Sequence, residues 1–263
     1  MLVFIEAIVF ALFIGIVASI LGIGGGVFLV PTLNLILGLN MHKAIGTSLF
    51  VIFFLTLSAS LSYFRRKRNL VLWKLALVFE SGSVPGAYLG AHLSNTLPSS
   101  WLKIGFSMVL LYTAFRMWRG AEKGRSGENE SKQSINMKQI DLKDPRYIIL
   151  LIGLGLIAGL LSGLLGIGGG VVKVPIMKLI LGLPMHNAVA TSAFMIVITS
   201  FMGSSTHFIM GNVDYLLGLT LIPFVMLGSN IGTRIAMRLK GATISRFFAV
   251  LLAFVAIRMI LSI

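Results

Sequence analysis

Long runs of apolar residues alternate with short polar breaks along almost the whole chain. A helix needs about 20 apolar residues to cross the core of a bilayer. We expect long helices over about 3–21, 44–63, 70–92, 101–118, 147–165, 187–208, 214–236 and 244–262. Two apolar stretches, 26–39 and 170–183, follow glycine runs and are too short for an upright crossing. The pattern predicts an all-α polytopic membrane protein, and it leaves open whether the two short stretches cross or re-enter.

The chain also repeats itself. Gly22–Ser48 and Gly166–Ser192 share 18 identities over 27 positions at an offset of 144, which slips to about 142 in the later helices. We therefore expect two homologous halves, 1–118 and 147–263, each with about four long helices and one short, broken or re-entrant helix. The segment between them, 119–146, is rich in Lys, Glu, Ser and Asn and carries five of the eight acidic residues. That composition is typical of a solvated linker.

Composition narrows the function classes. Hydrophobic residues make up 57% of the 263 residues and charged residues 11%, whereas a soluble domain is about a quarter charged. The net charge of +14 is better explained by basic loops on the cytoplasmic side of a membrane than by nucleic-acid binding. The absence of cysteine excludes disulfides and thiolate metal sites. Met1–Glu6 lacks the basic segment of a cleaved signal peptide, so we expect the first helix to be retained.

Basic residues predict the orientation of the two halves. In the first half Arg65–Arg68 is basic and the next loop, 94–100, has no Lys or Arg; in the second half the loop 209–213 has none and the next is flanked by Arg and Lys. Corresponding loops then lie on opposite sides of the membrane. We expect an inverted repeat, with the linker in the cytoplasm and both termini outside. A parallel repeat stays open because the short segments could re-enter.

One motif occurs twice and identifies a family. Gly22-Ile-Gly-Gly-Gly-Val27 returns as Gly166-Ile-Gly-Gly-Gly-Val171, and each copy is followed by Val-Pro and then by Met-His-x-Ala-x-x-Thr-Ser. The doubled motif resembles the TauE/SafE family of membrane transporters over nearly the whole chain. The resemblance implies a multi-pass permease of the plasma (inner) membrane, and the better-known members export sulfite or small organosulfonates. No feature of the sequence selects one anion.

The glycine runs are the first candidates for substrate binding. A run of residues without a Cβ lets backbone N–H groups approach a ligand closely, and each run leads into a helix start that favours anions. Two such ends could converge near the midplane, as in other transporters with broken helices. The alternative is that the glycines only permit close helix packing. The candidate substrate-binding glycines are Gly24, Gly25, Gly26, Gly168, Gly169 and Gly170.

Polar side chains near the glycine runs extend the candidate site. Lys173 has no charged counterpart, since the offset pairs it with Leu29. It could neutralise an anionic substrate or extend to the membrane interface along its aliphatic stem. Four hydroxyls lie at the starts of the helices after the short segments, where they could donate to an oxyanion, although helix capping is the simpler interpretation. These are Thr47, Ser48, Thr191 and Ser192.

Glu80 is the candidate for proton coupling. It is an acidic residue in the middle of an expected helix, just before Ser81–Gly86, a stretch prone to kinking because it contains proline. Burial favours the neutral form of a carboxyl group, which suits a proton carrier. The alternative is a structural acid paired with a basic residue such as Lys74 or Lys173. His42 and His186 are expected to be polar residues at helix entries.

Other function classes find little support. Neither a nucleophile with its base nor a recognisable set of metal ligands is present, so we predict no enzyme, no metal and no cofactor. The leading hypothesis is a secondary transporter that moves a small anion, sulfite or an organosulfonate, by alternating access at a midplane site. The alternative is a metal cation or a neutral solute carried on the same scaffold. Expected partners are the anion and the lipid bilayer, with no nucleic acid; association into a homo-oligomer stays open.

Overall fold

A computed structural model describes residues 2–66, 70–123 and 144–260, which form helices joined by short turns and contain no strand. The elements of the first half are α1 (Leu2–Leu21), α2 (Gly26–Pro31), the π-helical turn η1 (Thr32–Ile36), α3 (Met41–Arg66), α4 (Trp73–Thr96) and α5 (Ser99–Lys123). Those of the second half are α6 (Pro145–Leu165), α7 (Gly170–Pro175), the π-helical turn η5 (Ile176–Ile180), α8 (Met185–Ile209), α9 (Tyr215–Ala236) and α10 (Gly241–Ile260). Each expected long helix is present, and both halves follow the same order.

The helices on either side of the predicted linker are longer than the hydropathy pattern indicates. Helix α5 continues to Lys123, and α6 begins at Pro145. Asp144 ends the linker as an N-cap, because its carboxylate accepts a hydrogen bond of 2.9 Å from the backbone N–H of Arg146. Proline at the first position of α6 fits because its missing N–H would have no partner there. The rest of the predicted linker, 124–143, lies outside the described residues.

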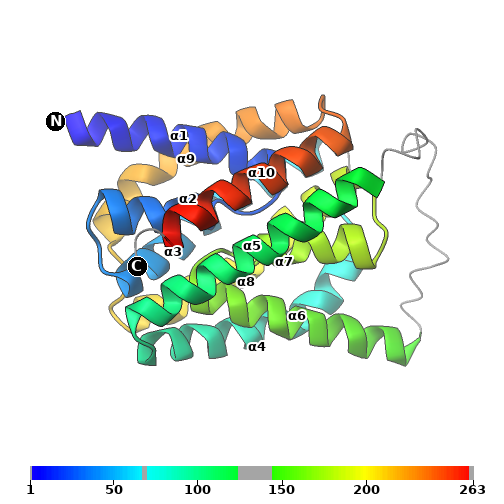
Figure 1. The fold of residues 1–263 in the computed structure, drawn as a ribbon, viewed down its shortest axis with the longest axis horizontal. Helices are drawn as coiled ribbons and strands as arrows, with labels where there is room; N and C mark the ends of the chain where they lie inside the picture. The colour runs from blue at the N-terminus through cyan, green and yellow to red at the C-terminus, as the bar shows by residue number, and fades with distance from the viewer. Residues whose placement is uncertain (1, 67–69, 124–143, 261–263) are drawn as a thin grey trace.

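Each short segment is an α-helix of six residues followed by a π-helical turn of five. Proline stands at both junctions, Pro31 and Pro175, where its ring and missing N–H disturb the regular hydrogen-bond ladder. Eleven residues rise about 16 Å in a helix, roughly half of a bilayer core. Figure 1 shows the chain turning back after α1, so that α2 and η1 run towards the end of the molecule where α1 begins.

The two halves are interleaved: helices of each half pack against helices of the other half. Helix α4 of the first half packs against α6 of the second, and α9 of the second half packs against α1 of the first. Figure 1 shows these pairs along opposite edges, with α5 and α10 crossing in front. Helices α3 and α8 pack against each other in the interior. Helix α4 corresponds to α9, and α6 to α1, so the same contact is made twice with the roles of the halves exchanged.

Glycine faces bring the interleaved helices together. A Cβ on any of these glycines of the α4–α6 pair would lie 2.0–2.3 Å from a carbonyl oxygen of the facing helix: Gly82, Gly86, Gly90, Gly155, Gly159 and Gly163. The α1–α9 pair repeats the arrangement, with approaches of 2.2–2.3 Å at Gly15, Gly228 and Gly232. Any other side chain would force the backbones apart, and close approach through small residues is how membrane helices associate.

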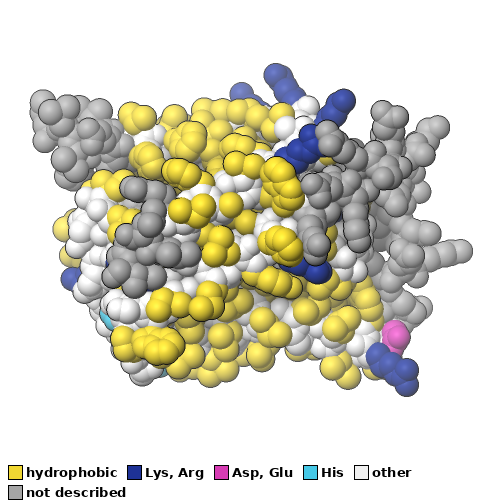
Figure 2. Space-filling model, in the orientation of Figure 1, with side chains coloured by type: hydrophobic (Ala, Val, Ile, Leu, Met, Phe, Trp, Pro, Cys, Tyr) yellow, Lys and Arg dark blue, Asp and Glu magenta, His cyan; other side chains and the backbone are white. Residues whose placement is uncertain are grey.

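The outer surface is apolar. Large side chains such as those of Trp101, Phe254 and Ile209 are exposed, and Figure 2 shows hydrophobic side chains across the described part of the visible face, with most Lys and Arg towards the right of the view. Among the residues that the structure describes, four helices are each long and apolar enough to span a bilayer on their own: α3, α6, α8 and α9. An apolar surface of this extent on a helical chain belongs in lipid. The protein is therefore an integral multi-pass membrane protein.

Candidate functional site

The two predicted glycine runs meet in the interior. A Cβ on Gly26 would lie 2.3 Å from the carbonyl oxygen of Gly166, and one on Gly170 would lie 2.6 Å from that of Gly22. The third glycine of each run therefore touches the backbone of the other half. This contact explains one glycine in each run by packing alone.

The middle glycines turn the chain into the short helices. Gly25 and Gly169 are the N-caps of α2 and α7, with φ of 89° and 79° in the left-handed region that residues with a side chain rarely adopt. The carbonyl of Gly169 accepts a 2.9 Å hydrogen bond from the N–H of Lys173, and the carbonyl of Gly25 accepts one from Leu29. The first glycines, Gly24 and Gly168, also have positive φ.

Two serines fasten each glycine turn to the opposite half. Ser48 Oγ on α3 donates a 3.0 Å hydrogen bond to the carbonyl of Gly166, and Ser192 Oγ on α8 donates a 2.8 Å hydrogen bond to the carbonyl of Gly22. Both serines are fully buried. These hydrogen bonds give the serines a structural role across the repeat interface, and their direct contact with a substrate stays a prediction.

The two candidate threonines hold the starts of other helices. Thr47 Oγ1 accepts a 2.9 Å hydrogen bond from the N–H of Asp214, the N-cap of α9, and Thr191 Oγ1 accepts a 3.0 Å hydrogen bond from the N–H of Leu72, the N-cap of α4. The hydroxyls thus satisfy helix-start N–H groups, as capping would, but on a helix of the opposite half. A role in substrate binding stays a prediction for them as well.

Lys173 and Glu80 form an ion pair inside the protein. The Nζ of Lys173 lies 2.5 Å from Oε1 of Glu80, and the two side chains are 0% and 3% exposed. Helix α7 carries the lysine one turn after Gly169, and α4 brings the glutamate from the other half. Of the alternatives left open by the sequence, the structure selects pairing of Glu80 with Lys173 and not with Lys74, and it places the Lys173 ammonium inside rather than at an interface.

Thr199 of α8 completes this group. Its Oγ1 donates a 2.6 Å hydrogen bond to Oε2 of Glu80 and also accepts a hydrogen bond from the ammonium of Lys173. The carboxylate therefore has a partner on each oxygen, which is what a buried charge requires. We call Lys173, Glu80 and Thr199 the polar cluster. The helices that meet there are α4, α7 and α8, from both halves of the chain.

The first half has aliphatic side chains at the positions that correspond to the polar cluster. The offset between the halves pairs the members of the polar cluster with Leu29, Ile222 and Leu55. All three are buried, and a Cβ on Gly25 would touch Leu55 at 3.2 Å, as one on Gly169 would touch Lys173. We call these three residues the apolar counterpart. Charge therefore distinguishes one of two otherwise similar sites.

Sequence reasoning missed Thr199 and Ser162. Ser162 of α6 is fully buried next to the Gly169 turn, and its hydroxyl has no hydrogen-bond partner among the residues that the structure describes. Comparison of the two halves could have identified Thr199. A position with a polar residue in one half and an aliphatic residue in the other is a candidate for a function that only one half has. Lys173 against Leu29 follows that pattern, and Thr199 against Leu55 extends it.

Two of the histidines have backbone partners, whereas the buried Nδ1 of His42 has no hydrogen-bond partner among the described residues. His186 Nε2 lies 3.0 Å from the carbonyl of Leu239, consistent with a polar residue at a helix entry. His207, which is fully buried, contacts the carbonyl of Gly163 at 3.1 Å. Its counterpart in the first half is Tyr63, whose hydroxyl donates to the carbonyl of Ser19. In the described part of the chain, no three His, Asp or Glu side chains are grouped closely enough to hold a metal ion.

The fold and the site together define a class. Two homologous helical halves, glycine-broken helices that meet in the interior, and a buried charged pair between the halves are the features of secondary membrane transporters. The comparisons with known proteins identify a membrane transporter. The profile of the family described as Sulfite exporter TauE/SafE matches residues 7–259, and the chain belongs to this family.

Curated relatives carry the same general description. The chain is 33% identical to the probable membrane transporter protein YunE of Bacillus subtilis, over 98% of this chain and 97% of that protein. It is 30% identical to a probable membrane transporter protein of Methanocaldococcus jannaschii, over 84% of this chain and 79% of the relative. No solved structure matches the chain. The protein is thus a membrane transporter of the TauE/SafE family, and neither its family nor its relatives are described as enzymes.

Proposed function

We propose that the protein is a secondary transporter that carries a small sulfur oxyanion, sulfite or an organosulfonate, across the plasma membrane by alternating access. The observation that carries this proposal is the buried ammonium of Lys173 directly after the second glycine turn. A charged group inside a membrane protein is costly and marks the path of a substrate or ion. An anion can replace the Glu80 carboxylate as the partner of this ammonium, whereas a metal cation cannot, and the family description supports an anion.

The polar cluster also provides a way to couple the anion to a proton. At rest the charges of Lys173 and Glu80 cancel. If an anion takes the place of the carboxylate beside the ammonium, the site gains a negative charge unless Glu80 takes up a proton. Proton binding to Glu80 and anion binding to Lys173 therefore favour each other, because together they keep the buried site neutral. This coupling moves one proton with each monovalent anion.

The glycine turns provide the moving parts of the proposed site. Both runs, Gly24–Gly26 and Gly168–Gly170, lie where the two halves touch, so a shift of the short helices α2 and α7 against the opposite half would change this contact. The serine and threonine hydroxyls that tie the turns to the opposite half would exchange partners during such a shift. That exchange is how they would reach the anion.

The orientation in the membrane belongs to the same proposal. An inverted repeat places the linker in the cytoplasm and both termini outside. Two features support it: the distribution of Lys and Arg between corresponding loops, and the start of α6 at the opposite end of the molecule from the start of α1 in Figure 1.

Flux into proteoliposomes of the purified protein tests the proposal. Sulfite, sulfate, thiosulfate, taurine and sulfoacetate are compared with and without a pH gradient. We expect saturable transport of one sulfur oxyanion, accelerated by the gradient, and no transport by Lys173→Met. Glu80→Gln should keep exchange of the anion but lose the acceleration. Ser200→Ala, beside Thr199 but hydrogen-bonded to its own helix, serves as the control. Full transport by Lys173→Met would refute the site.

A further inference from the structure

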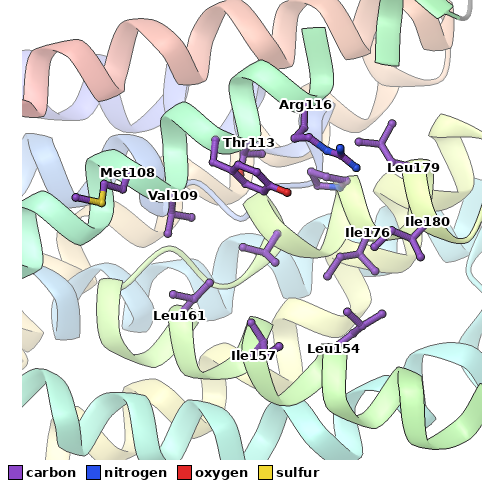
Figure 3. Close-up of a pocket in the computed structure, with 13 residues that line it drawn as sticks. Met108, Val109, Thr113, Arg116, Leu154, Ile157, Leu161, Ile176, Leu179 and Ile180 are labelled. Atoms are coloured by element: carbon purple, nitrogen blue, oxygen red, sulfur yellow. The ribbon is translucent and has the colours of Figure 1, made fainter. Parts of the chain in front are cut away.

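A cavity of about 520 Å³ opens between α5, α6 and the short segment α7–η5. Its body is apolar: Leu154, Ile157 and Leu161 of α6 form one wall, Met108 of α5 another, and Ile176 of η5 lies between them (Figure 3). It spans about 12 Å along α5, from Met108 to the turn of Arg116, at 1.5 Å per residue. No candidate substrate residue lines it, so it is distinct from the polar cluster.

One end of this cavity is cationic. The side chain of Arg116 extends over the end near Leu179, while the aliphatic side chains lie below it (Figure 3). Arg116 is exposed, and within 2–66, 70–123 and 144–260 it makes no hydrogen bond or ion pair. Trp118, two residues further along α5 and on a different face of the helix, is half exposed. An arginine and an exposed tryptophan at nearly the same height on a membrane helix are typical of the level of the lipid headgroups.

The first half carries aromatic side chains at three of the corresponding positions. The offset pairs Leu154 with Phe10 and Ile157 with Phe13, and the rings of Phe10 and Phe13 lie 6.2 Å apart. A third wall position, Val172, has Phe28 as its counterpart. In the second half, smaller aliphatic side chains line the cavity at these three positions.

We infer that this cavity binds an anionic phospholipid, with one acyl chain among the α6 side chains and the phosphodiester on Arg116. The apolar body matches an acyl chain, and a guanidinium forms paired hydrogen bonds with phosphate oxygens. An anionic headgroup also complements the arginine, whereas a zwitterionic headgroup brings its own cation. Basic pockets between membrane helices are sites for anionic lipids.

The lipid would brace the segment that carries the transport lysine. Val172 lines the cavity while the next residue, Lys173, faces Glu80 in the interior. An acyl chain packed against Val172 and Ile176 holds the short segment in place from outside. Anionic lipid is therefore expected to stabilise the protein whether or not any anion is transported.

Lipid binding is measured by native mass spectrometry and thermal unfolding of the delipidated protein, with phosphatidylglycerol and phosphatidylcholine as the probes. We expect phosphatidylglycerol to remain bound and to raise the unfolding temperature more than phosphatidylcholine does. Arg116→Gln should weaken phosphatidylglycerol binding about fivefold, the effect of one basic group near an anionic headgroup, and remove most of the preference. The control is Arg246→Gln, which removes an exposed arginine of a different helix, α10.

Filling the cavity gives an independent test. Leu154→Phe with Ile157→Phe copies the first half and should abolish binding of both lipids, whereas Leu216→Phe on the exposed face of α9 should change nothing. Equal phosphatidylglycerol binding by Arg116→Gln, or unchanged binding after filling, would overturn the inference. Preferential binding of a long-chain alkanesulfonate over phosphatidylglycerol would do so too, by assigning the cavity to a different amphiphile. None of these readouts depends on transport.

Discussion

The polar cluster and the apolar counterpart occupy equivalent places in the two halves, each one turn beyond a left-handed glycine and beneath a helix from the opposite half. One contains an ammonium, a carboxylate and a hydroxyl, and the other contains three aliphatic side chains. The fold closes around both. The backbone arrangement therefore does not require the charges, and apolar side chains of similar volume often stabilise a protein as well as a buried ion pair does. On the proposed function, the polar cluster is therefore present for transport rather than for folding.

Copying the apolar counterpart into the second half gives the largest expected effect. Lys173→Leu leaves the carboxylate of Glu80 buried without its cation, and we expect a loss of about 3–5 kcal/mol in unfolding free energy together with loss of transport. Adding Glu80→Ile should restore stability but not transport. Thermal unfolding in detergent and flux in proteoliposomes measure the two quantities. A double variant no more stable than the single one would show that the fold does need the pair.

Removing the shared hydroxyl should have the next largest effect. Thr199→Val keeps the shape but takes one hydrogen bond from the carboxylate of Glu80, which we expect to cost about 1.5–3 kcal/mol because the acceptor is charged. Transport should fall with it. Ser200→Ala, whose hydroxyl bonds to the carbonyl of Ile196 on the same helix, should cost less. Equal losses for the two variants would mean that Thr199 contributes nothing particular to the polar cluster.

Substitutions at the two glycine turns separate the cost of backbone strain from the effect on transport. Gly25→Ala and Gly169→Ala both impose a left-handed backbone on a residue with a Cβ, at about 1–2 kcal/mol each, so their stabilities should fall alike. Only at Gly169 does the new methyl press on the Lys173 side chain, 3.2 Å away. Transport should therefore fall more for Gly169→Ala. Equal transport by two equally stable variants would contradict a site centred on the second turn.

Removing the serine hydroxyls that bond to the glycine turns should have the smallest effect on stability, and the effect should be similar in the two halves. Ser48→Ala and Ser192→Ala each remove one hydrogen bond to a glycine carbonyl of the other half, and we expect about 1 kcal/mol from each. The measurement is thermal unfolding of the two variants in parallel. A much larger loss at one serine would show that the halves are unequal in their scaffold as well as in their chemistry.

Much of this architecture follows from the sequence, because hydropathy and self-similarity are local signals. Every long helix, both short segments and the isolated charges Glu80 and Lys173 are evident without a structure. The pairing of α4 with α6 is not, since it depends on which helices become neighbours. For the same reason the sequence offered Lys74 and Lys173 as equal partners for Glu80. Thr199 was hidden because one threonine in an apolar helix attracts no notice until its neighbours are known.

The interleaving of the two halves has a consequence for how the protein is made. Helix α1 ends at Leu21, and its glycine-face partner α9 begins only at Tyr215. At about 5–20 residues per second of translation, α1 waits on the order of ten to forty seconds for that partner. Through this interval its close-packing face meets lipid, and α4 waits in the same way for α6. Neither half can therefore complete its helix packing until the other has been synthesised.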